Sequence, residues 1–375
     1  MADRSGAARL ALLRGIGAFA RGLPSAEASG GAPRLLVIRP DHLGDVLLTT
    51  AALRALRARE PDAEITALVG PWSAEVLRRN PDVDCVLVYP FPWFDRRPAG
   101  LAERYAAAGA LAGWLRALAF ERAYVLRTDH WWGAMAAALA AIPERIGYGV
   151  THNRPFLTRA LPPPAQEHVV RSALRLVAGD EAAAAPIGTP PTCFRPSGAD
   201  RGWACATTDR EARYVVVHPG ASTALKRWPA ERWGVVAEAL RGEGFEVWLA
   251  GGPGEESVVD EVAGHAPKAQ VVRPAPSLGR LGALFERAVL ALGMDSAPMH
   301  LATAVGAPTV RMVGPADETL FGPWGDPELH VTVRAAGTAP DPTWFAGGER
   351  PHPTLTAIEP GQVLGAVDTL RARLT

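Results

Sequence analysis

The chain has 375 residues, and its 39 Lys and Arg are balanced by 39 Asp and Glu, so the formal net charge is zero. This balance provides no global basic field for a nucleic acid, and no nucleic-acid partner is expected. The length suits two globular domains. No apolar run approaches the roughly 20 residues that span a bilayer. The three cysteines lack metal-site or disulfide spacing, which favours a reducing cytoplasm.

Residues 1–33 precede the first predicted strand as an extension. Apolar residues recur near helical spacing within it, and arginines lie between them. The pattern is typical of an interfacial helix on an anionic membrane. It fits a frayed basic tail equally well. Peripheral membrane contact is therefore one of two interpretations of this segment.

The next segment predicts a strand, a tight loop and a helix. The buried-strand run Leu35–Ile38 leads into a loop that holds Asp41, Gly44 and Asp45, and helical spacing begins directly afterwards. The loop has one glycine where GxGxxG has three, and its two carboxylates would repel a pyrophosphate. We therefore expect this loop to accept a proton or hold a hydroxyl group.

Strands and helices alternate along both halves of the chain, which implies βαβ units and mostly parallel sheets. The first half predicts strands at 65–69, 85–89 and 123–126 and helices at 72–79, 101–120 and 167–177. The second half predicts strands at 214–217, 245–250, 271–272 and 289–292, a last strand at 309–313, and helices at 230–241, 278–288 and 298–305.

Proline-rich, aperiodic sequence separates the two series. We expect an N-terminal Rossmann-like domain at 34–185, a linker at 186–213 and a C-terminal Rossmann-like domain at 214–375, with the two domains facing a cleft. Neither half has GxGxxG after its first strand, which disfavours a dinucleotide oxidoreductase.

Three loops at predicted strand ends of the second half are candidate ligand-binding loops. In the first loop, Ser222 and Thr223 offer hydroxyl groups and Lys226 offers charge to phosphate oxygens. An ordinary basic surface loop is the alternative. In another loop, glycines at 251–254 allow close approach of a ligand, and Glu255 suits ribose hydroxyls.

The remaining loop runs through Asp295 and Ser296 into a helix. Ser296 can cap that helix, which leaves N–H groups for an anion. Asp295 could orient a donor or a sugar hydroxyl, or serve as a second cap acceptor. His300 lies within the helix and is either a ligand or a core histidine.

Together these blocks resemble glycosyltransferase family nine, the heptosyltransferases that extend the lipopolysaccharide core. Four motifs occur in order over residues 34–325: RLLVIRPDHLGDVLLTTAALRAL, HPGASTALKRWPAERW, GGPGEE and GMDSAPMHLATAVGAPTVRMVGP. The resemblance implies a GT-B fold and inverting transfer without a metal or other cofactor. It also implies a nucleotide-sugar donor, ADP-heptose being favoured, and a glycan or glycolipid acceptor.

Site residues follow from the same resemblance. Asp45 would be the general base, with Asp41 and Gly44 on the acceptor side. The donor would contact a larger set in the second half: Ser222, Thr223, Lys226, Glu255, Asp295, Ser296, Ala297, Met299 and His300. A nucleotide-sugar epimerase of similar build and a non-catalytic nucleotide-sugar-binding protein are the alternative functions.

The chain departs from the family pattern at one place. Ala297 stands where the family has glycine, which would weaken the site if this position needed a positive φ. Met294 and the pair Trp131–Trp132 suggest a changed donor or acceptor pocket. The DxD sequence at Asp82–Asp84 matches a metal-binding signature of another transferase class, but it precedes a strand and is interpreted as a solvated turn.

Overall fold

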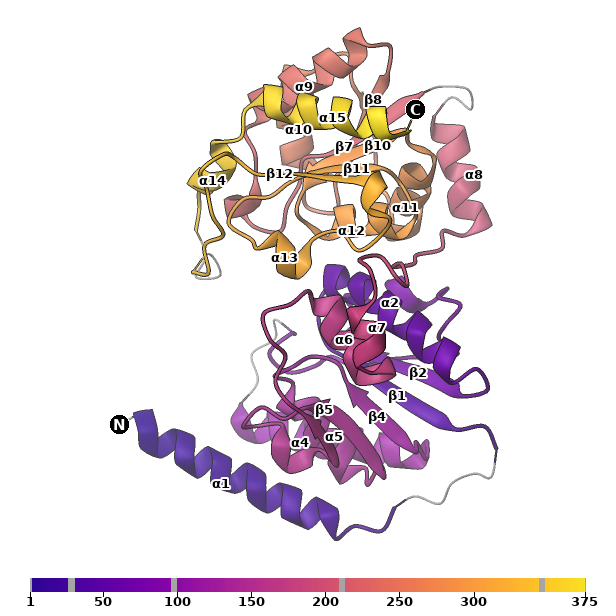
Figure 1. Cartoon of the computed structure of the whole chain (residues 1–375), viewed down its shortest axis with the longest axis vertical. Helices are drawn as coiled ribbons and strands as arrows, with labels where there is room; N and C mark the ends of the chain where they lie inside the picture. The colour runs from indigo at the N-terminus through magenta and orange to yellow at the C-terminus, as the bar shows by residue number, and fades with distance from the viewer. Residues whose placement is uncertain (1, 26–30, 96–99, 209–212, 344–347, 375) are drawn as a thin grey trace. The chain divides into compact units, whose positions relative to one another are not determined.

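The computed structural model describes residues 2–25, 31–95, 100–208, 213–343 and 348–374, with the backbone alone for 2–6. The chain forms two compact units, residues 1–185 and 186–375. Each unit contains one parallel six-stranded sheet with helices packed on it (Figure 1). The prediction of two Rossmann-like α/β domains is confirmed.

The N-terminal sheet has the strand order of a Rossmann fold. In sheet order its strands are β3 (Cys85–Val88), β2 (Glu64–Val69), β1 (Arg34–Arg39), β4 (Arg122–Val125), β5 (Glu144–Tyr148) and β6 (Arg159–Leu161). The order reverses between β1 and β4, and such a switch point is where ligands bind, beyond the carboxyl ends of the strands.

Helices cover both faces of this sheet, as apolar parallel strands require. α1 (Ala2–Arg21), α4 (Leu101–Ala117) and α5 (Trp131–Leu139) share one core with alternate residues of β1 and β4. α2 (Leu43–Arg59) and α6 (Val169–Ala178) pack against each other on the opposite face. The shorter helices are α3 (Ala74–Leu77), η1 (Arg154–Phe156) and α7 (Asp180–Ala184).

The C-terminal sheet repeats this topology. In sheet order its strands are β12 (His330–Val333), β11 (Thr309–Met312), β10 (Leu290–Met294), β7 (Tyr214–His218), β8 (Glu246–Leu249) and β9 (Gln270–Val271). Its switch point therefore lies between β7 and β10. The loops after these two strands hold most of the predicted donor residues.

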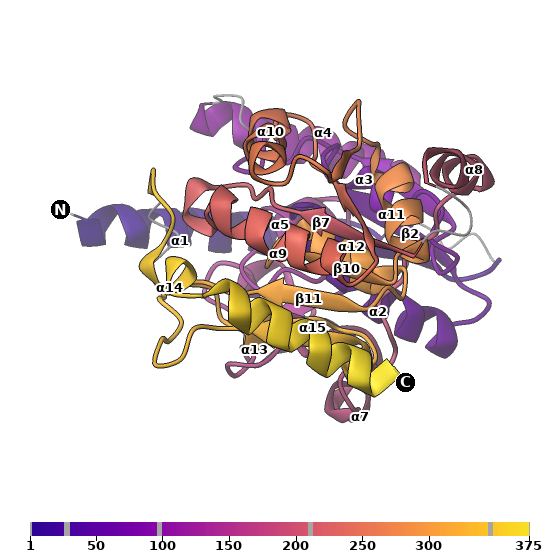
Figure 2. The same cartoon turned by 90° about the horizontal axis from the view of Figure 1, so that it is seen from above.

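One face of the C-terminal sheet is covered by α9 (Ala230–Gly242), α10 (Glu256–His265) and α15 (Pro360–Leu374), with α9 beside α15 (Figure 2). α11 (Leu278–Arg287) and α12 (Ala297–Ala304) contact each other on the other face. The remaining helices are α8 (Gly198–Thr207), η2 (Ala224–Lys226), α13 (Glu318–Phe321), η3 (Pro327–Leu329) and α14 (Pro353–Thr356).

Three predicted boundaries are wrong. Residues 186–213 are not a separate linker, because they belong to the second unit and their helix α8, begun by a capping box of Ser197 and Asp200, packs on α11. The strand at 309–313 is not the last, because β12 pairs with β11. The helix predicted at 72–79 is only the single turn α3.

The N-terminal extension is a packed helix, so the frayed-tail interpretation is wrong for residues 2–21. Leu13 is fully buried and Ala20 is 5% exposed. A Cβ atom at Gly17 would lie 2.5 Å from the backbone oxygen of Pro155, so this glycine lets α1 lie directly against η1. In the described residues, no helix is long and apolar enough to cross a membrane.

Candidate functional site

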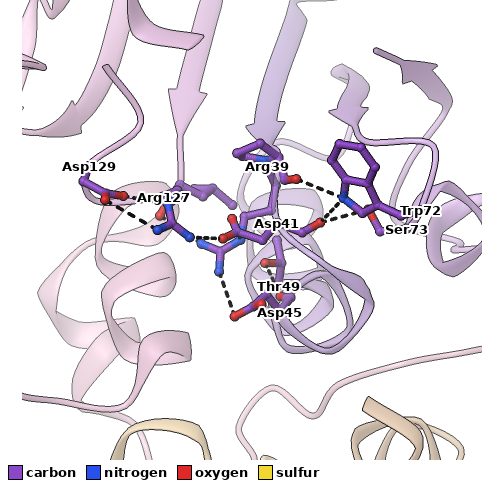
Figure 3. Close-up of polar contacts among 10 residues, drawn as sticks. Arg39, Asp41, Asp45, Thr49, Trp72, Ser73, Arg127 and Asp129 are labelled. Carbon is purple, nitrogen blue, oxygen red and sulfur yellow. Dashed lines mark hydrogen bonds and ion pairs between the residues drawn. The ribbon is translucent and has the colours of Figure 1, made fainter. Parts of the chain in front are cut away.

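The first cluster of polar residues lies at the carboxyl end of β1 (Figure 3). Asp41 follows the strand and is only 2% exposed. Its Oδ2 lies 2.9 Å from Nε of Arg39, and its Oδ1 accepts a hydrogen bond from Arg127, which follows β4. Arg39 also donates to the backbone oxygen of Leu126 at 3.2 Å. The β1–β4 switch point thus holds a buried carboxylate between two guanidinium groups.

These charges fix the protonation state of Asp41. Burial favours the neutral acid, but the positive charges of Arg39 and Arg127 outweigh it and hold the pKa of Asp41 below its ordinary value. Asp41 is therefore ionised and fully engaged. It is suited to holding the two arginines in place and poorly suited to taking a proton.

Asp45 lies in a different environment, four residues after Asp41. α2 begins at Leu43, so Gly44 and Asp45 occupy its first turn and not a loop, which corrects the sequence prediction. The Asp45 side chain is 34% exposed, and its Oδ1 lies 3.6 Å from Nη2 of Arg39. Partial burial raises the pKa of Asp45 and repulsion from Asp41 adds to the rise, which outweighs the opposing effect of the Arg39 charge. A reachable carboxylate with a raised pKa suits a general base.

The loop that carries Asp41 is held by the segment that follows a neighbouring strand. After β2, the indole N–H of Trp72 donates to the backbone oxygens of Pro40 and Asp41, at 3.1 and 2.9 Å (Figure 3). Ser73 donates to the same Asp41 oxygen at 3.2 Å. His130 lies near Asp41 and Arg127, and burial lowers its pKa to about 3, so this imidazole is neutral.

A second cluster lies at the β7–β10 switch point of the C-terminal unit. Lys226 Nζ donates to the backbone oxygen of Asp295 at 2.9 Å and to its Oδ2 at 3.4 Å. Arg311 comes from the middle of β11, is fully buried, and places Nη1 3.6 Å from Asp295 Oδ1. Burial favours neutral Asp295, but Lys226, His300 and Arg311 together lower its pKa. The result is an ionised carboxylate that holds a lysine at a strand end.

Beside this cluster, Glu255 folds back over the end of β7. Its Oε2 accepts the Gly252 N–H at 2.8 Å and lies 3.4 Å from Nε2 of His218, whose pKa is lowered by burial. A Cβ atom at Gly220 would collide with the Glu255 carboxylate. Gly220 is therefore required for the present position of Glu255.

Comparisons with known proteins assign the chain to a family. The sequence pattern of glycosyltransferase family 9 (heptosyltransferase) matches residues 109–342, more than half of the chain. The chain belongs to glycosyltransferase family 9. It is thus a glycosyltransferase, which disfavours the epimerase and the non-catalytic binding protein.

Individual relatives agree with this assignment. Lipopolysaccharide heptosyltransferase 3 of Escherichia coli is 27% identical, over 87% of this chain and 96% of its own length. The structure of E. coli ADP-heptose lps heptosyltransferase II has a TM-score of 0.74 at 22% identity, covering 91% of this chain and all of that one. An E. coli heptosyltransferase with ADP-2-deoxy-2-fluoro heptose has a TM-score of 0.65 at 20% identity, covering 89% and 99%. The GT-B fold is confirmed.

The structure places most of the predicted donor residues of this family 9 protein around the β7–β10 switch point. Ser222 is exposed, and Thr223 has a buried hydroxyl without a hydrogen-bond partner among the described residues. Ser296 stands at the N-cap of α12, but its hydroxyl donates to the Met294 oxygen at 3.1 Å and caps no N–H. The predicted cap is therefore wrong.

Two other predicted donor residues have buried side chains, and a third lies in the first turn of α12. Met299 is fully buried, and its N–H donates to Ser296, so its side chain belongs to the core. His300 is 8% exposed and lies near enough to Asp295 to contribute to the lowering of the Asp295 pKa. Ala297 is the first residue of α12 and is not among the positive-φ residues, so the loss of glycine causes no backbone strain there.

Two further sequence features prove to be structural as well. Trp132 is 1% exposed, stacks on Tyr89 and donates its indole N–H to the Arg104 backbone, so it does not line a ligand pocket. Both carboxylates of the DxD sequence pair with arginines of α2, Asp82 with Arg54 and Asp84 with Arg57.

Three arginines of these clusters were not among the residues predicted from sequence: Arg39, Arg127 and Arg311. Arg311 interrupts the apolar run of β11, and a charged residue inside a buried strand requires a counter-ion. That rule alone could have indicated its pairing with Asp295. Arg39 and Arg127 each stand at or just beyond a central strand end, which is the position that singled out Asp41.

Proposed function

We propose that this protein is an inverting, metal-independent glycosyltransferase that moves heptose from ADP-heptose to a hydroxyl group of a glycan or glycolipid, in the synthesis of lipopolysaccharide or a related surface glycan. The observation that carries the proposal is the contrast between the two carboxylates of the first cluster. Asp41 is locked between arginines, while Asp45 is reachable and has a raised pKa.

In this mechanism the acceptor oxygen attacks the anomeric carbon of the donor as Asp45 takes its proton. The bond from that carbon to the diphosphate breaks, and its electron pair leaves with ADP. Attack from the face opposite the leaving group inverts the anomeric centre. Proton removal by a positioned base contributes about 10²–10⁴-fold to such a rate.

Charge for the leaving diphosphate would come from Lys226. Its ammonium group is held at the β7–β10 switch point by ionised Asp295, and the first N–H groups of α12 lie at the same strand end. Ser222 and Thr223 would donate to phosphate oxygens, and Glu255 would accept from the ribose hydroxyls. Together these groups would stabilise the departing ADP.

ADP-heptose is proposed because a heptosyltransferase of similar fold is known with an ADP-heptose analogue, and because relatives are named lipopolysaccharide heptosyltransferases. We propose the cytoplasm, at the inner face of the cytoplasmic membrane, as the place of action. The three cysteines of the protein, Cys85, Cys193 and Cys205, are free thiols, which is the form that a reducing compartment favours.

A donor panel tests the proposal. Purified protein is incubated with ADP-heptose or with GDP-, UDP- and dTDP-sugars, and with a heptose-deficient lipopolysaccharide core as acceptor. Mass spectrometry of the acceptor should show one added heptose from ADP-heptose, with an unchanged rate in excess EDTA. Transfer from another donor alone would overturn the assignment of the donor. Loss of the rate in EDTA, restored by added Mg²⁺, would overturn the metal-independent mechanism.

A further inference from the structure

We propose that α1 and its two flanking pockets form a binding surface for anionic phospholipid, which holds the enzyme on the membrane. This proposal extends the membrane location proposed above. It concerns a helix that takes no part in either polar cluster. Figure 1 shows α1 outside the N-terminal sheet, on the side where α5 lies.

One flank of α1 is apolar and open. Leu12 is 51% exposed and Phe19 is 65% exposed, and with Ile16 they follow helical spacing along one stripe. Together with Met135 and Leu139 of α5, the stripe lines an apolar pocket of about 460 Å³. Exposed large apolar side chains that line an apolar pocket are typical of an interaction site.

The other flank of α1 is basic. Arg14 and Arg21 stand two helical turns apart, and with Arg154 of η1 they line a second pocket of about 440 Å³. None of these three arginines forms an ion pair with a carboxylate of the described residues. Within the part of the chain that the structure describes, Arg21 donates to the backbone oxygen of Pro155, at 3.2 Å. Three guanidinium groups that line one pocket suit a phosphate group.

The residues between the two flanks are small. Ala11, Gly15 and Ala18 face outward, and residues 7–25 contain no acidic residue. A helix with exposed apolar groups on one side, arginines on the other and no negative charge can lie in the interface of an anionic bilayer. Acyl chains would contact Leu12 and Phe19, while headgroup phosphates would bind Arg14, Arg21 and Arg154.

Vesicle sedimentation of the full chain tests this surface without donor or acceptor, so its outcome is independent of glycosyl transfer. The protein should bind vesicles of 70% phosphatidylcholine and 30% phosphatidylglycerol, and bind pure phosphatidylcholine far more weakly. Each arginine near an anionic surface contributes about fivefold to partitioning. Arg14→Glu/Arg21→Glu should therefore weaken binding at least about 20-fold. Leu12→Ser/Phe19→Ser should weaken it at least about tenfold.

The control is Arg350→Glu/Arg373→Glu, which changes the net charge equally at exposed positions of the other unit and should leave binding unchanged. Circular dichroism confirms that each variant is folded. No binding of wild-type protein to the anionic vesicles would overturn the proposal, as would equal losses in the control. Light scattering without vesicles tests whether a second copy of the chain covers the stripe instead. A wild-type dimer that is dissociated by Leu12→Ser/Phe19→Ser would assign the stripe to a second copy and overturn the proposal.

Discussion

Replacing Asp45 by Asn tests the proposed base while disturbing little else. The change keeps the size of the side chain and removes its ability to take a proton. The α2 start should survive, because Thr49 donates to the Asp45 backbone oxygen at 2.8 Å and this bond does not involve the side chain. An acidic group in a first helical turn contributes only about 0.3–1 kcal/mol. Unfolding therefore cannot account for a large loss of turnover.

Turnover should fall by about 10²–10⁴-fold, which corresponds to about 2.7–5.4 kcal/mol of transition-state free energy. The affinity for ADP, measured by calorimetry, should change less than about threefold, because Asp45 lies in the unit that does not carry the proposed diphosphate site. Asp62→Asn is a matched control, since Asp62 is an exposed aspartate of the same unit. Transfer kinetics with ADP-heptose at saturating acceptor provide the assay.

The pH profile gives a second reading of the same variant. Because burial raises the pKa of Asp45, wild-type activity should fall as the pH drops, at a pH above the ordinary range of an aspartate. This acidic limb should be absent in Asp45→Asn. Turnover within about threefold of wild type, or an unchanged acidic limb, would refute the assignment of Asp45 as the base.

Three further predictions concern the rest of the site. Lys226→Met should weaken ADP binding by about 10–150-fold in calorimetry, as expected for a charge-assisted contact; unchanged affinity would place the diphosphate elsewhere. Gly220→Ala should displace the flexible Glu255 carboxylate and weaken ADP binding while the melting temperature stays within a few degrees; unchanged affinity would remove Glu255 from the ribose. Burial lowers the pKa of His130 to about 3 in the folded protein, so as the pH falls below about 6.5 the histidine gains a proton in the unfolded chain first. The folded state therefore loses stability as the pH falls through this range. Urea unfolding of His130→Phe should lose about 2 kcal/mol less stability than wild type between pH 6.5 and 5, and an identical pH dependence would contradict the neutral buried imidazole.

The strand–loop–helix at the start of the first domain could be predicted well from sequence. An apolar run followed by helical spacing predicted β1 and α2, and the two carboxylates between them led us to propose a site at this strand end. The family resemblance proposed different roles for Asp41 and Asp45, but the sequence did not indicate the different environments of the two carboxylates. The environment of Asp41 depends on Arg127, which lies 86 residues away in sequence and reaches Asp41 through the pairing of β1 with β4.

Elsewhere the limits of the sequence have similar physical causes. The short strand β12 has four residues and is only partly buried, so it carries little apolar pattern. Met299 lies beside the site in sequence, but the rotation of α12 directs it into the core against Gly293. The four ordered motifs identified the family, and they did so more securely than any single residue.

The anomeric configuration of the product tests the central claim most directly. After transfer from ADP-heptose, NMR of the extended acceptor reports the configuration of the new glycosidic bond. A single displacement assisted by Asp45 predicts inversion relative to the donor. Retention would contradict it, because retention requires a covalent intermediate or a different arrangement of the reacting groups.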